Sequence, residues 1–249
     1  MTCSTAVLLA AGQGSRMGTE IRKQYLELGG EPLLARPLRT FLKSSVITDI
    51  VLVIPEGDEK FIRETIIPAA LNNTSGAPDM PGAEGKIRAI IPGGKERYDS
   101  VWRGLQAIDW PCDYVFIHDG ARPFIQEDAL ARLLEAVKEQ GTAVAAMPSK
   151  DTVKIADKDG FVTDTPDRSS VWIVQTPQVF DKMLITGAYE EMMQKLPELN
   201  ARGIRITDDA MAVELMTGRK VKLVPASYSN IKVTTPDDIA AAAALLEYL

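Results

Sequence analysis

The N-terminal segment reads Ala6-Val-Leu-Leu-Ala-Ala-Gly-Gln-Gly-Ser-Arg-Met-Gly18, an apolar strand pattern followed by a glycine-rich turn. A buried strand that ends in such a turn is typical of doubly wound α/β folds, in which ligands bind beyond the carboxyl ends of the strands. Two cations follow, with Arg16 just beyond the turn and Lys23 seven residues later. Backbone N–H groups and cations together favour binding of a triphosphate. The alternative at this point is an ordinary turn with solvated basic residues.

The same stretch matches the dinucleotide-binding motif G-x-G-x-x-G poorly. Gly12 and Gly14 fit the first two positions, but Met17 stands where the third glycine is required. The motif also needs an acidic residue about 20 positions on, at the end of a second strand. Glu27 and Glu31 do not meet this requirement, because the next strand pattern begins only at residue 49. We therefore disfavour an NAD-dependent oxidoreductase.

Composition and charge restrict the class of protein. The chain has 249 residues, 45% of them hydrophobic, which suits one α/β domain with a sizeable core. A net charge of -6 argues against a general nucleic-acid binder. No run approaches the roughly 20 apolar residues of a membrane span. Cys3 and Cys112 lie outside any C-x-x-C pair, as expected for reduced thiols. We expect a cytoplasmic protein that binds neither nucleic acid nor a membrane.

Short apolar runs alternate with longer amphipathic runs in the first 150 residues. The strand candidates are 6–10, 49–54, 87–91, 114–117 and 143–147, and the helix candidates are 33–44, 58–71, 97–108 and 127–140. This alternation predicts a doubly wound, mostly parallel, Rossmann-like sheet. A helix at 181–195, a strand at 221–224 and a terminal helix at 239–249 complete a single domain, 1–249.

Two segments depart from the alternation. Residues 150–178 are polar, with strand-like pieces at 152–155 and 161–163 around the turn Lys158-Asp-Gly160, and they predict a β-arm at about 150–172. A lone two-stranded arm is marginally stable in water, so we expect it to pack against a second copy of the chain. Residues 72–86 are rich in Gly, Pro and Asn without periodicity, which predicts a mobile surface insertion.

Three polar loops that contain glycine are predicted at one edge of the sheet. They are the turn after the first strand, Pro92-Gly-Gly94 after the third, and His118-Asp-Gly-Ala-Arg-Pro123 after the fourth. Asp119 at this edge is suited to holding Mg²⁺ beside a triphosphate, with a capping role as the alternative. His118, the only histidine, is interpreted as a packed or hydrogen-bonded loop residue. A phosphate nucleophile is already ionised near neutral pH and needs no general base.

Several cations and hydroxyls adjoin unusual local sequences. Singly, each is an ordinary surface charge, turn or cap residue. As a group, the cations fit a site for two phosphorylated substrates, because Arg binds phosphate bidentately. The cations are Arg97, Arg122, Arg168 and Lys232, and the hydroxyls suited to phosphate or sugar are those of Thr152, Thr176 and Thr207.

Short motifs follow one another along the whole chain. They are Ala10-Ala-Gly-x-Gly-x-Arg16-Met, Lys23-Gln-Tyr25, Gly93-Gly-x-x-Arg97-x-x-Ser100-Val, His118-Asp-x-Ala-Arg122-Pro, Asp151-Thr152, Thr176-Pro-Gln178, Thr207-Asp208 and Asn230-Ile-Lys232-Val-Thr. In order and spacing this set resembles the 2-C-methyl-D-erythritol 4-phosphate cytidylyltransferase family. The resemblance implies a homodimeric, Mg²⁺-dependent enzyme. It implies that CTP and methylerythritol phosphate give the CDP-alcohol and pyrophosphate, in the non-mevalonate route to isoprenoid precursors.

The resemblance also implies a role for each motif residue. Arg16 and Lys23 stabilise the pentacoordinate transition state at the α-phosphorus, and Asp119 binds Mg²⁺. The residues implied to bind CTP are Ala10, Ala11, Gly12, Gly14, Gly94, Arg97, Ser100, Gly120 and Arg122, with Gly94 and Ser100 at the cytosine. The residues implied to bind the acceptor are Thr152, Arg168, Thr176, Thr207 and Lys232. Among these, Arg168 and Lys232 position the substrate, and Thr152 and Arg168 come from the partner subunit.

Four positions depart from the family's pattern. Arg22 replaces a proline and can itself reach phosphate, while Lys95 replaces an aspartate and removes its contact to base or ribose. Gly120 replaces an alanine, and Met211 stands where a small residue is usual. A sister enzyme that uses ribitol 5-phosphate is the nearest alternative. A catalytically silent nucleotide-binding regulator is disfavoured, because the predicted catalytic and metal-binding residues are all present.

Overall fold

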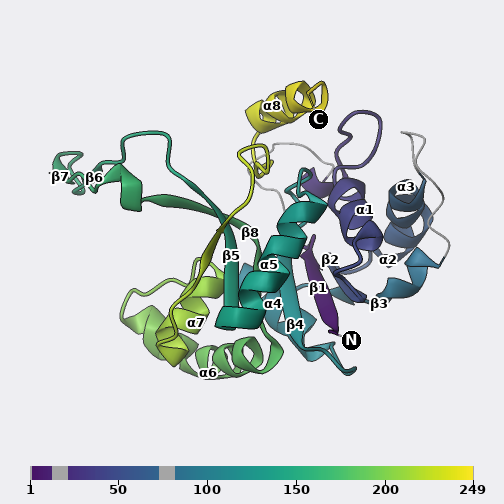
Figure 1. Cartoon of the computed structure of the whole chain (residues 1–249), viewed down its shortest axis with the longest axis horizontal. Helices are drawn as coiled ribbons and strands as arrows, with labels where there is room; N and C mark the ends of the chain where they lie inside the picture. Colours follow the sequence, from purple (N-terminus) through teal and green to yellow (C-terminus); the bar gives the residue numbers. More distant parts are fainter. Residues whose placement is uncertain (1, 13–21, 73–81, 249) are drawn as a thin grey trace.

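The computed structural model describes residues 2–12, 22–72 and 82–248. Its centre is a seven-stranded sheet in the order β3-β2-β1-β4-β8-β5-β9 (Figure 1). The strands are β1 (Ser4–Leu9), β2 (Asp49–Ile54), β3 (Ile87–Pro92), β4 (Tyr114–Asp119), β5 (Thr142–Pro148), β8 (Trp172–Asp181) and β9 (Leu223–Pro225). Of these, β8 alone runs antiparallel to its neighbours. The predicted doubly wound, mostly parallel sheet is confirmed.

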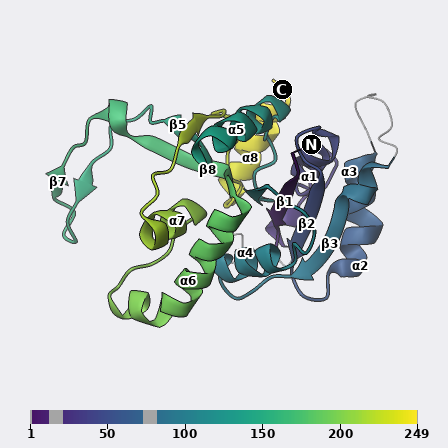
Figure 2. The same ribbon diagram turned by 60° about the horizontal axis from the view of Figure 1, so that its bottom comes forward.

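Helices cover both faces of the sheet (Figure 2). Side chains of β1 alternate between the faces, with Ala6 and Leu8 in one hydrophobic cluster and Val7 in the other, all fully buried. The first cluster includes residues of α1 (Ala35–Lys43) and α5 (Glu127–Gln140). The second includes residues of α4 (Arg97–Gln106), α6 (Lys182–Ala201) and α7 (Asp209–Thr217). Burial on both faces explains why the strand sequences are apolar without alternation.

The remaining helical segments lie at the margins of the sheet. The predicted helix at 58–71 is one continuous segment made of α2 (Glu59–Phe61), the π-helical η3 (Ile62–Ile66) and α3 (Ile67–Leu71). The terminal helix α8 (Pro236–Leu246) lies beyond the carboxyl edge of the strands (Figure 1). Its Ala242 packs in a third hydrophobic cluster with Leu28, Leu33, Phe124 and Val233. The chain's end therefore adds a cover near the edge where the predicted site lies.

Strand β8 corrects the prediction for residues 150–178. The sequence pattern indicated a polar arm up to about residue 172 and no strand between it and the helix at 181–195, whereas β8 runs through the sheet between β4 and β5. Pro177 lies within β8, and a proline is unusual in a central strand because it cannot donate to a ladder. The pairing of β5 with β8 is irregular there, between Val144 and Ala146. Gln175, Thr176 and Gln178 are buried, and their hydrogen bonds come from distant parts of the chain.

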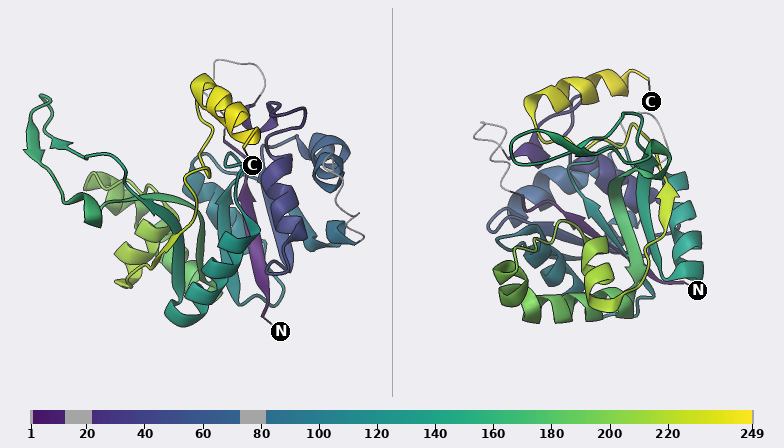
Figure 3. Two further views of the ribbon diagram at one scale, coloured as in Figure 1. Left: turned by 45° about the horizontal axis from the view of Figure 1, so that its top comes forward. Right: turned by 90° about the vertical axis from the view of Figure 1, so that its left-hand side faces the viewer.

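The predicted β-arm projects away from the body of the molecule (Figures 1 and 3). Its tip is the antiparallel pair β6 (Ile155–Ala156) and β7 (Val162–Asp164). Its root is fixed to the body, because the Tyr228 hydroxyl donates to the Pro148 carbonyl at 2.8 Å and the Lys150 ammonium lies over the Tyr228 ring. The apolar side chains at the tip are at least half exposed: Ile155 at 50%, Phe161 at 72% and Val162 at 56%.

The predicted mobile insertion at 72–86 lies largely outside the described residues. At its end, η4 (Ala83–Lys86) is a 3₁₀ helix held against the end of α1. The Lys86 ammonium donates to the carbonyls of Leu42 and Ser44, both at 2.8 Å. Lys86, at the end of the predicted insertion, thus supplies donors to carbonyls that end a helix.

None of the helices in the described ranges combines the length and the apolar character needed to cross a bilayer.

Candidate active site

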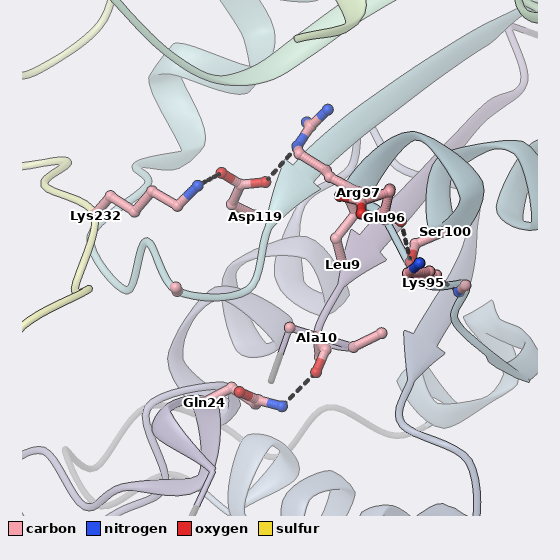
Figure 4. Close-up of a pocket in the computed structure, with 13 residues that line it drawn as sticks. Leu9, Ala10, Gln24, Lys95, Glu96, Arg97, Ser100, Asp119 and Lys232 are labelled. Atoms are coloured by element: carbon pink, nitrogen blue, oxygen red, sulfur yellow. Dashed lines mark hydrogen bonds and ion pairs between the residues drawn. The ribbon is translucent and has the colours of Figure 1, made fainter. Parts of the chain in front are cut away.

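Two adjoining cavities lie at the carboxyl edge of the sheet. The first has a volume of about 170 Å³ and the second of about 240 Å³. Arg97, Asp119 and Lys232 line both, so these three side chains form the boundary between the cavities. The predicted convergence of the loops after β1, β3 and β4 at one edge agrees with this arrangement (Figure 4).

The first cavity is built mainly from backbone and small side chains. The loop after β1 contributes Ala10, Ala11 and Gly12, and the loop after β3 contributes Gly94. Each loop is tied to β2, because the Ala10 N–H donates to the Val53 carbonyl and the Gly93 N–H donates to the Ile54 carbonyl, both at 2.7 Å. The full set of lining residues is Leu9, Ala10, Ala11, Gly12, Gln24, Gly94, Lys95, Glu96, Arg97, Ser100, Asp119, Ala121 and Lys232. A wall of this kind brings backbone N–H and C=O groups close to a ligand.

The Gly93-Gly94 loop is fixed by close packing. A Cβ at Gly93 would lie 2.2 Å from the Ala11 Cβ, and a Cβ at Gly94 would lie 2.2 Å from the Asp99 Cβ. The Gly94 N–H donates to the Ser100 hydroxyl at 3.0 Å, so the first turn of α4 determines the loop's position. Both positions therefore require glycine for steric reasons.

Asp119 is the centre of a charged cluster (Figure 4). The Lys232 Nζ lies 2.7 Å from Asp119 Oδ2, and the Arg97 Nε lies 3.2 Å from Asp119 Oδ1. Burial alone would raise the pKa of Asp119, but the charges of Arg97 and Lys232 outweigh it and hold that pKa well below its usual range. The carboxylate is therefore ionised near neutral pH.

Arg97 also forms a bidentate ion pair with Asp209, at 2.8 and 2.7 Å. Asp209 is fully buried in the first turn of α7, and the Tyr189 hydroxyl of α6 donates to its Oδ1. Burial lowers the pKa of Arg97, but Asp209 and Asp119 raise it well above the usual value. Arg97, predicted to bind CTP, is therefore engaged with two carboxylates at the boundary of the cavities.

The second cavity is polar and adds residues of the predicted acceptor site. Arg122 donates through Nη1 to the Asn230 carbonyl at 2.8 Å, while its buried Nε has no hydrogen-bond partner among the residues that the structure describes. A buried guanidinium N–H without a partner is suited to an anionic ligand. The lining residues are Arg97, Asp119, Arg122, Val174, Gln175, Thr176, Gln178, Thr207, Asp208 and Lys232. Arg122, predicted at the CTP, thus lies beside Thr207 and Lys232.

His118 is a packed, hydrogen-bonded residue, as interpreted from the sequence. It is fully buried, its Nδ1 lies 3.2 Å from the Thr176 hydroxyl and its Nε2 lies 3.2 Å from the Arg122 carbonyl. The Arg122 carbonyl can only accept, so the proton is assigned to Nε2 and the Thr176 hydroxyl donates to Nδ1. The same hydroxyl accepts from the Asp119 N–H at 3.0 Å. Burial lowers the pKa of His118 to about 4. Thr176, predicted to bind the acceptor, uses its hydroxyl in this network.

Some predicted site residues do not line either cavity. Gly120 is buried, and a Cβ there would lie 2.6 Å from the Leu34 Cδ1 and 3.1 Å from the Leu9 carbonyl oxygen. Thr152 and Arg168 are exposed on the arm, where Arg168 donates to the Lys150 carbonyl at 3.3 Å. Neither residue lines the cavities of its own chain, and the arm that carries them projects away from the body of the molecule (Figure 1).

Two predicted residues, Gly14 and Arg16, lie outside the described residues. Lys23 begins a short 3₁₀ helix, Lys23–Tyr25, which is placed by its neighbour Gln24, whose Nε2 donates to the Ala10 carbonyl. Arg22 pairs with Asp58 at 3.4 Å instead of reaching toward the cavities as predicted.

The sequence reasoning missed several residues of the site. Gln24 was quoted within a motif and given no role, although it lines the first cavity. Asp209 follows Thr207-Asp208, and its position is typical of an ordinary acidic residue at the start of a helix. Tyr189 is one aromatic residue within a helix pattern, and no local signal distinguishes it from a core residue. Only contacts between distant segments identify Asp209 and Tyr189.

A doubly wound sheet with a glycine-lined cavity, a central ionised carboxylate and convergent cations at its carboxyl edge defines a Rossmann-like nucleotidyltransferase. A family model described as IspD, 2-C-methyl-D-erythritol 4-phosphate cytidylyltransferase, matches residues 4–248. The chain belongs to this family.

Individual relatives agree with the family assignment. The 2-C-methyl-D-erythritol 4-phosphate cytidylyltransferase of Desulforamulus reducens is 42% identical over 242 residues, which cover 97% of this chain and 95% of that protein. That of Pelotomaculum thermopropionicum is 43% identical over 242 residues, with 97% and 93% covered. The crystal structure of 4-diphosphocytidyl-2C-methyl-D-erythritol synthase from Anaerococcus prevotii superimposes with a TM-score of 0.80 at 36% identity. It covers 99% of this chain and 96% of that one.

Proposed function

We propose that this protein transfers CMP from CTP to 2-C-methyl-D-erythritol 4-phosphate and releases pyrophosphate. The observation that carries the proposal is the pair of adjoining cavities that share Arg97, Asp119 and Lys232. Two substrates bound side by side meet at that boundary. Membership in the cytidylyltransferase family supports this assignment of the substrates.

The reaction joins two anions, and the site must offset their repulsion. An oxygen of the acceptor phosphate forms a bond to the α-phosphorus of CTP, and the bond from that phosphorus to the α,β-bridging oxygen breaks. The leaving pyrophosphate takes the electron pair. Fixed cations and oriented N–H groups stabilise the charge that develops, because they need no reorganisation during the reaction. We assign this stabilisation to Arg16 and Lys23, as the family's motif implies.

The first cavity is assigned to CTP and the second to the acceptor. We assign CTP to the loops that carry Ala10, Ala11, Gly12 and Gly14. Gly94 and Ser100 read the cytosine, since backbone groups can hydrogen-bond a base edge without a bulky side chain. Lys95, which departs from the family's pattern, lines this cavity as well.

Lys232, Thr207 and Arg122 supply charge and hydroxyl groups for the acceptor phosphate. Met211 adjoins this side, with its sulfur 3.5 Å from the Thr207 hydroxyl. His118 takes no part as a base, because its neutral ring is already hydrogen-bonded at both nitrogens. This agrees with a nucleophile that needs no deprotonation.

The residues present fit a divalent cation bound through one protein carboxylate. Asp119 lines both cavities and is ionised, while no group of three His, Cys, Asp or Glu side chains within the described ranges could hold a metal. Mg²⁺ is commonly held by one or two carboxylates together with substrate phosphates and water. We therefore propose that Asp119 holds Mg²⁺ with the triphosphate. When bound, Mg²⁺ neutralises charge on the phosphates and on the leaving pyrophosphate.

Thr152 and Arg168 are proposed to complete the acceptor site of a partner subunit. The exposed apolar side chains at the arm's tip and the projection of the arm away from the body of the molecule support a homodimer. Coexpression of a Lys23→Ala chain with an Arg168→Ala chain tests this exchange. If the arm serves the partner, the mixed dimer has one intact site, and about one quarter of wild-type activity is expected from random pairing. Activity no greater than that of either variant alone would contradict the exchange.

The acceptor is tested by turnover with CTP and either methylerythritol 4-phosphate or ribitol 5-phosphate. We expect pyrophosphate release to be faster with methylerythritol phosphate. Faster turnover with ribitol 5-phosphate would overturn the choice of acceptor and leave the nucleotide assignment intact. We also propose a cytoplasmic location, which the low cysteine content of the sequence favours.

A further inference from the structure

We propose that Asp209 is a positioning residue that binds both Nη atoms of Arg97, so that this guanidinium contacts Asp119 through Nε alone and leaves lone pairs of the Asp119 carboxylate for a divalent cation. The inference rests on the proposed function, because it concerns the carboxylate assigned to the metal. Asp209 itself lines neither cavity. It acts through the orientation of a neighbouring guanidinium.

The geometry of Arg97 carries the proposal. Both of its Nη atoms are directed at the two carboxylate oxygens of Asp209, at 2.8 and 2.7 Å. Asp119 receives only the Nε–H of the same guanidinium, at 3.2 Å. The fork of the guanidinium, which forms its strongest bonds to carboxylates, is thus used on Asp209 and turned away from Asp119.

Asp209 is held rigidly in this position. It is fully buried and accepts a hydrogen bond from Tyr189 of α6. The start of α7 is tied to β8, because Gln178 donates to Asp208 at 3.0 Å and accepts from the Ala210 N–H at 2.8 Å. A carboxylate fixed from both sides is able to fix the guanidinium that it binds.

Removal of the Asp209 charge would release the guanidinium. Arg97 lines both cavities, so a freed fork is able to pair bidentately with Asp119 or with a substrate phosphate. Either outcome opposes a divalent cation at Asp119: the first uses the lone pairs of the carboxylate, and the second places a competing positive charge at the triphosphate. Asp209 therefore sets how strongly Arg97 competes with the metal.

The test is the binding of Mn²⁺, followed by electron paramagnetic resonance, to protein saturated with α,β-methylene-CTP, which cannot be cleaved. Asp209→Asn keeps the shape of the side chain and removes its charge. We expect it to weaken Mn²⁺ binding by about 10- to 100-fold, the range seen when a group that orients a metal ligand is lost. Asp209→Glu keeps the charge and is expected to rescue most of the affinity. Unchanged Mn²⁺ affinity in folded Asp209→Asn overturns the proposal.

A double variant separates release of Arg97 from general damage to the site. Arg97→Gln with Asp209→Asn replaces the ion pair by a neutral, hydrogen-bonding pair and removes the competing cation. Mn²⁺ affinity is expected to return at least to the wild-type value, and an affinity as weak as that of Asp209→Asn would overturn the proposal. This variant carries the test alone if Asp209→Asn does not fold, as judged by circular dichroism.

Two further variants complete the experiment. Tyr189→Phe leaves in place the Asp209 charge and the Gln178 contacts that hold the start of α7. We therefore expect lower thermal stability with Mn²⁺ affinity within about twofold of wild type. A large loss of affinity in Tyr189→Phe would contradict a role that depends on charge. Asp119→Asn tests the proposed function separately. If it binds Mn²⁺ as tightly as wild type, the assignment of the metal to Asp119 fails, whatever Asp209 does.

Discussion

Acidification is expected to destabilise this protein through His118, and the size of the effect follows from burial. The imidazole is fully buried and neutral, and burial lowers its pKa from 6.5 to about 4. In the unfolded chain the ring is exposed and binds a proton below a pH of about 6.5. The folded-state pKa is depressed, so the unfolded state binds more protons between these two values. The stabilisation is complete above the unfolded pKa and is lost as the pH falls through the folded pKa.

The magnitude can be worked from the shift. Since one pKa unit corresponds to about 1.4 kcal/mol, the full loss is on the order of 3 kcal/mol. Most of the pH range between the two pKa values of His118 is reached without extreme acid. The linkage relation gives a loss of about 2 kcal/mol in the free energy of unfolding between pH 8 and pH 5. This is a large fraction of the 5–15 kcal/mol that roughly bounds the stability of a domain.

The assay compares wild type with His118→Gln by urea unfolding, followed by tryptophan fluorescence, at pH 8, 6.5 and 5 and at one protein concentration. The amide retains a donor and an acceptor and does not titrate. Other titrating groups are common to both proteins and cancel in the difference. We expect the free energy of unfolding of wild type, relative to the variant, to fall by about 2 kcal/mol over this range. Parallel pH profiles of the two proteins would refute the reasoning.

Other predictions concern the glycine loop, a catalytic cation and a helix cap. Gly94→Ala should lower the free energy of unfolding by about 1–3 kcal/mol, because its Cβ would lie 2.2 Å from the Asp99 Cβ. It should also abolish the rise in melting temperature on adding CTP, and a wild-type rise would contradict the assigned role of the loop. Lys23→Ala should reduce kcat by roughly 10²–10⁴-fold in steady-state assays through lost transition-state stabilisation, and full activity would show that the assignment is wrong. Asp181→Ala removes the carboxylate that accepts from the first N–H groups of α6. It should cost about 1 kcal/mol in urea unfolding with kcat unchanged, so a change in kcat would contradict its purely structural role.

The strands and helices that were predicted correctly are marked by local sequence patterns. The predicted strand at 49–54 and helix at 127–140 have the same bounds in the structure. Apolar runs, glycine turns and helix starts are read within a window of a few residues. Strand β8 was missed because its buried polar side chains look like those of a loop until their partners are known. Those partners lie 30 or more residues away, as for Gln178 with Asp208.

The site also contains residues that local patterns predict and residues whose position only the tertiary structure gives. The loop residues Ala10, Ala11, Gly12 and Gly94 were predicted because each follows a strand that is recognisable by itself, and they do line the first cavity. Arg122 was placed with the nucleotide, and the structure sets it in the second cavity. No local pattern tells on which side of Asp119 a long side chain will turn.

By itself, the sequence determined the strand–helix alternation, the glycine-rich edge and the family, since each depends on the order of residues along the chain. Only the tertiary structure decided which charges meet. Arg97 reaches Asp209, 112 positions away, and Lys232 reaches Asp119 from the far end of the chain. A buried charge must find a partner, because desolvation penalises it strongly. The identity of that partner depends on how the sheet brings loops together, and the sequence does not contain that information in any one segment.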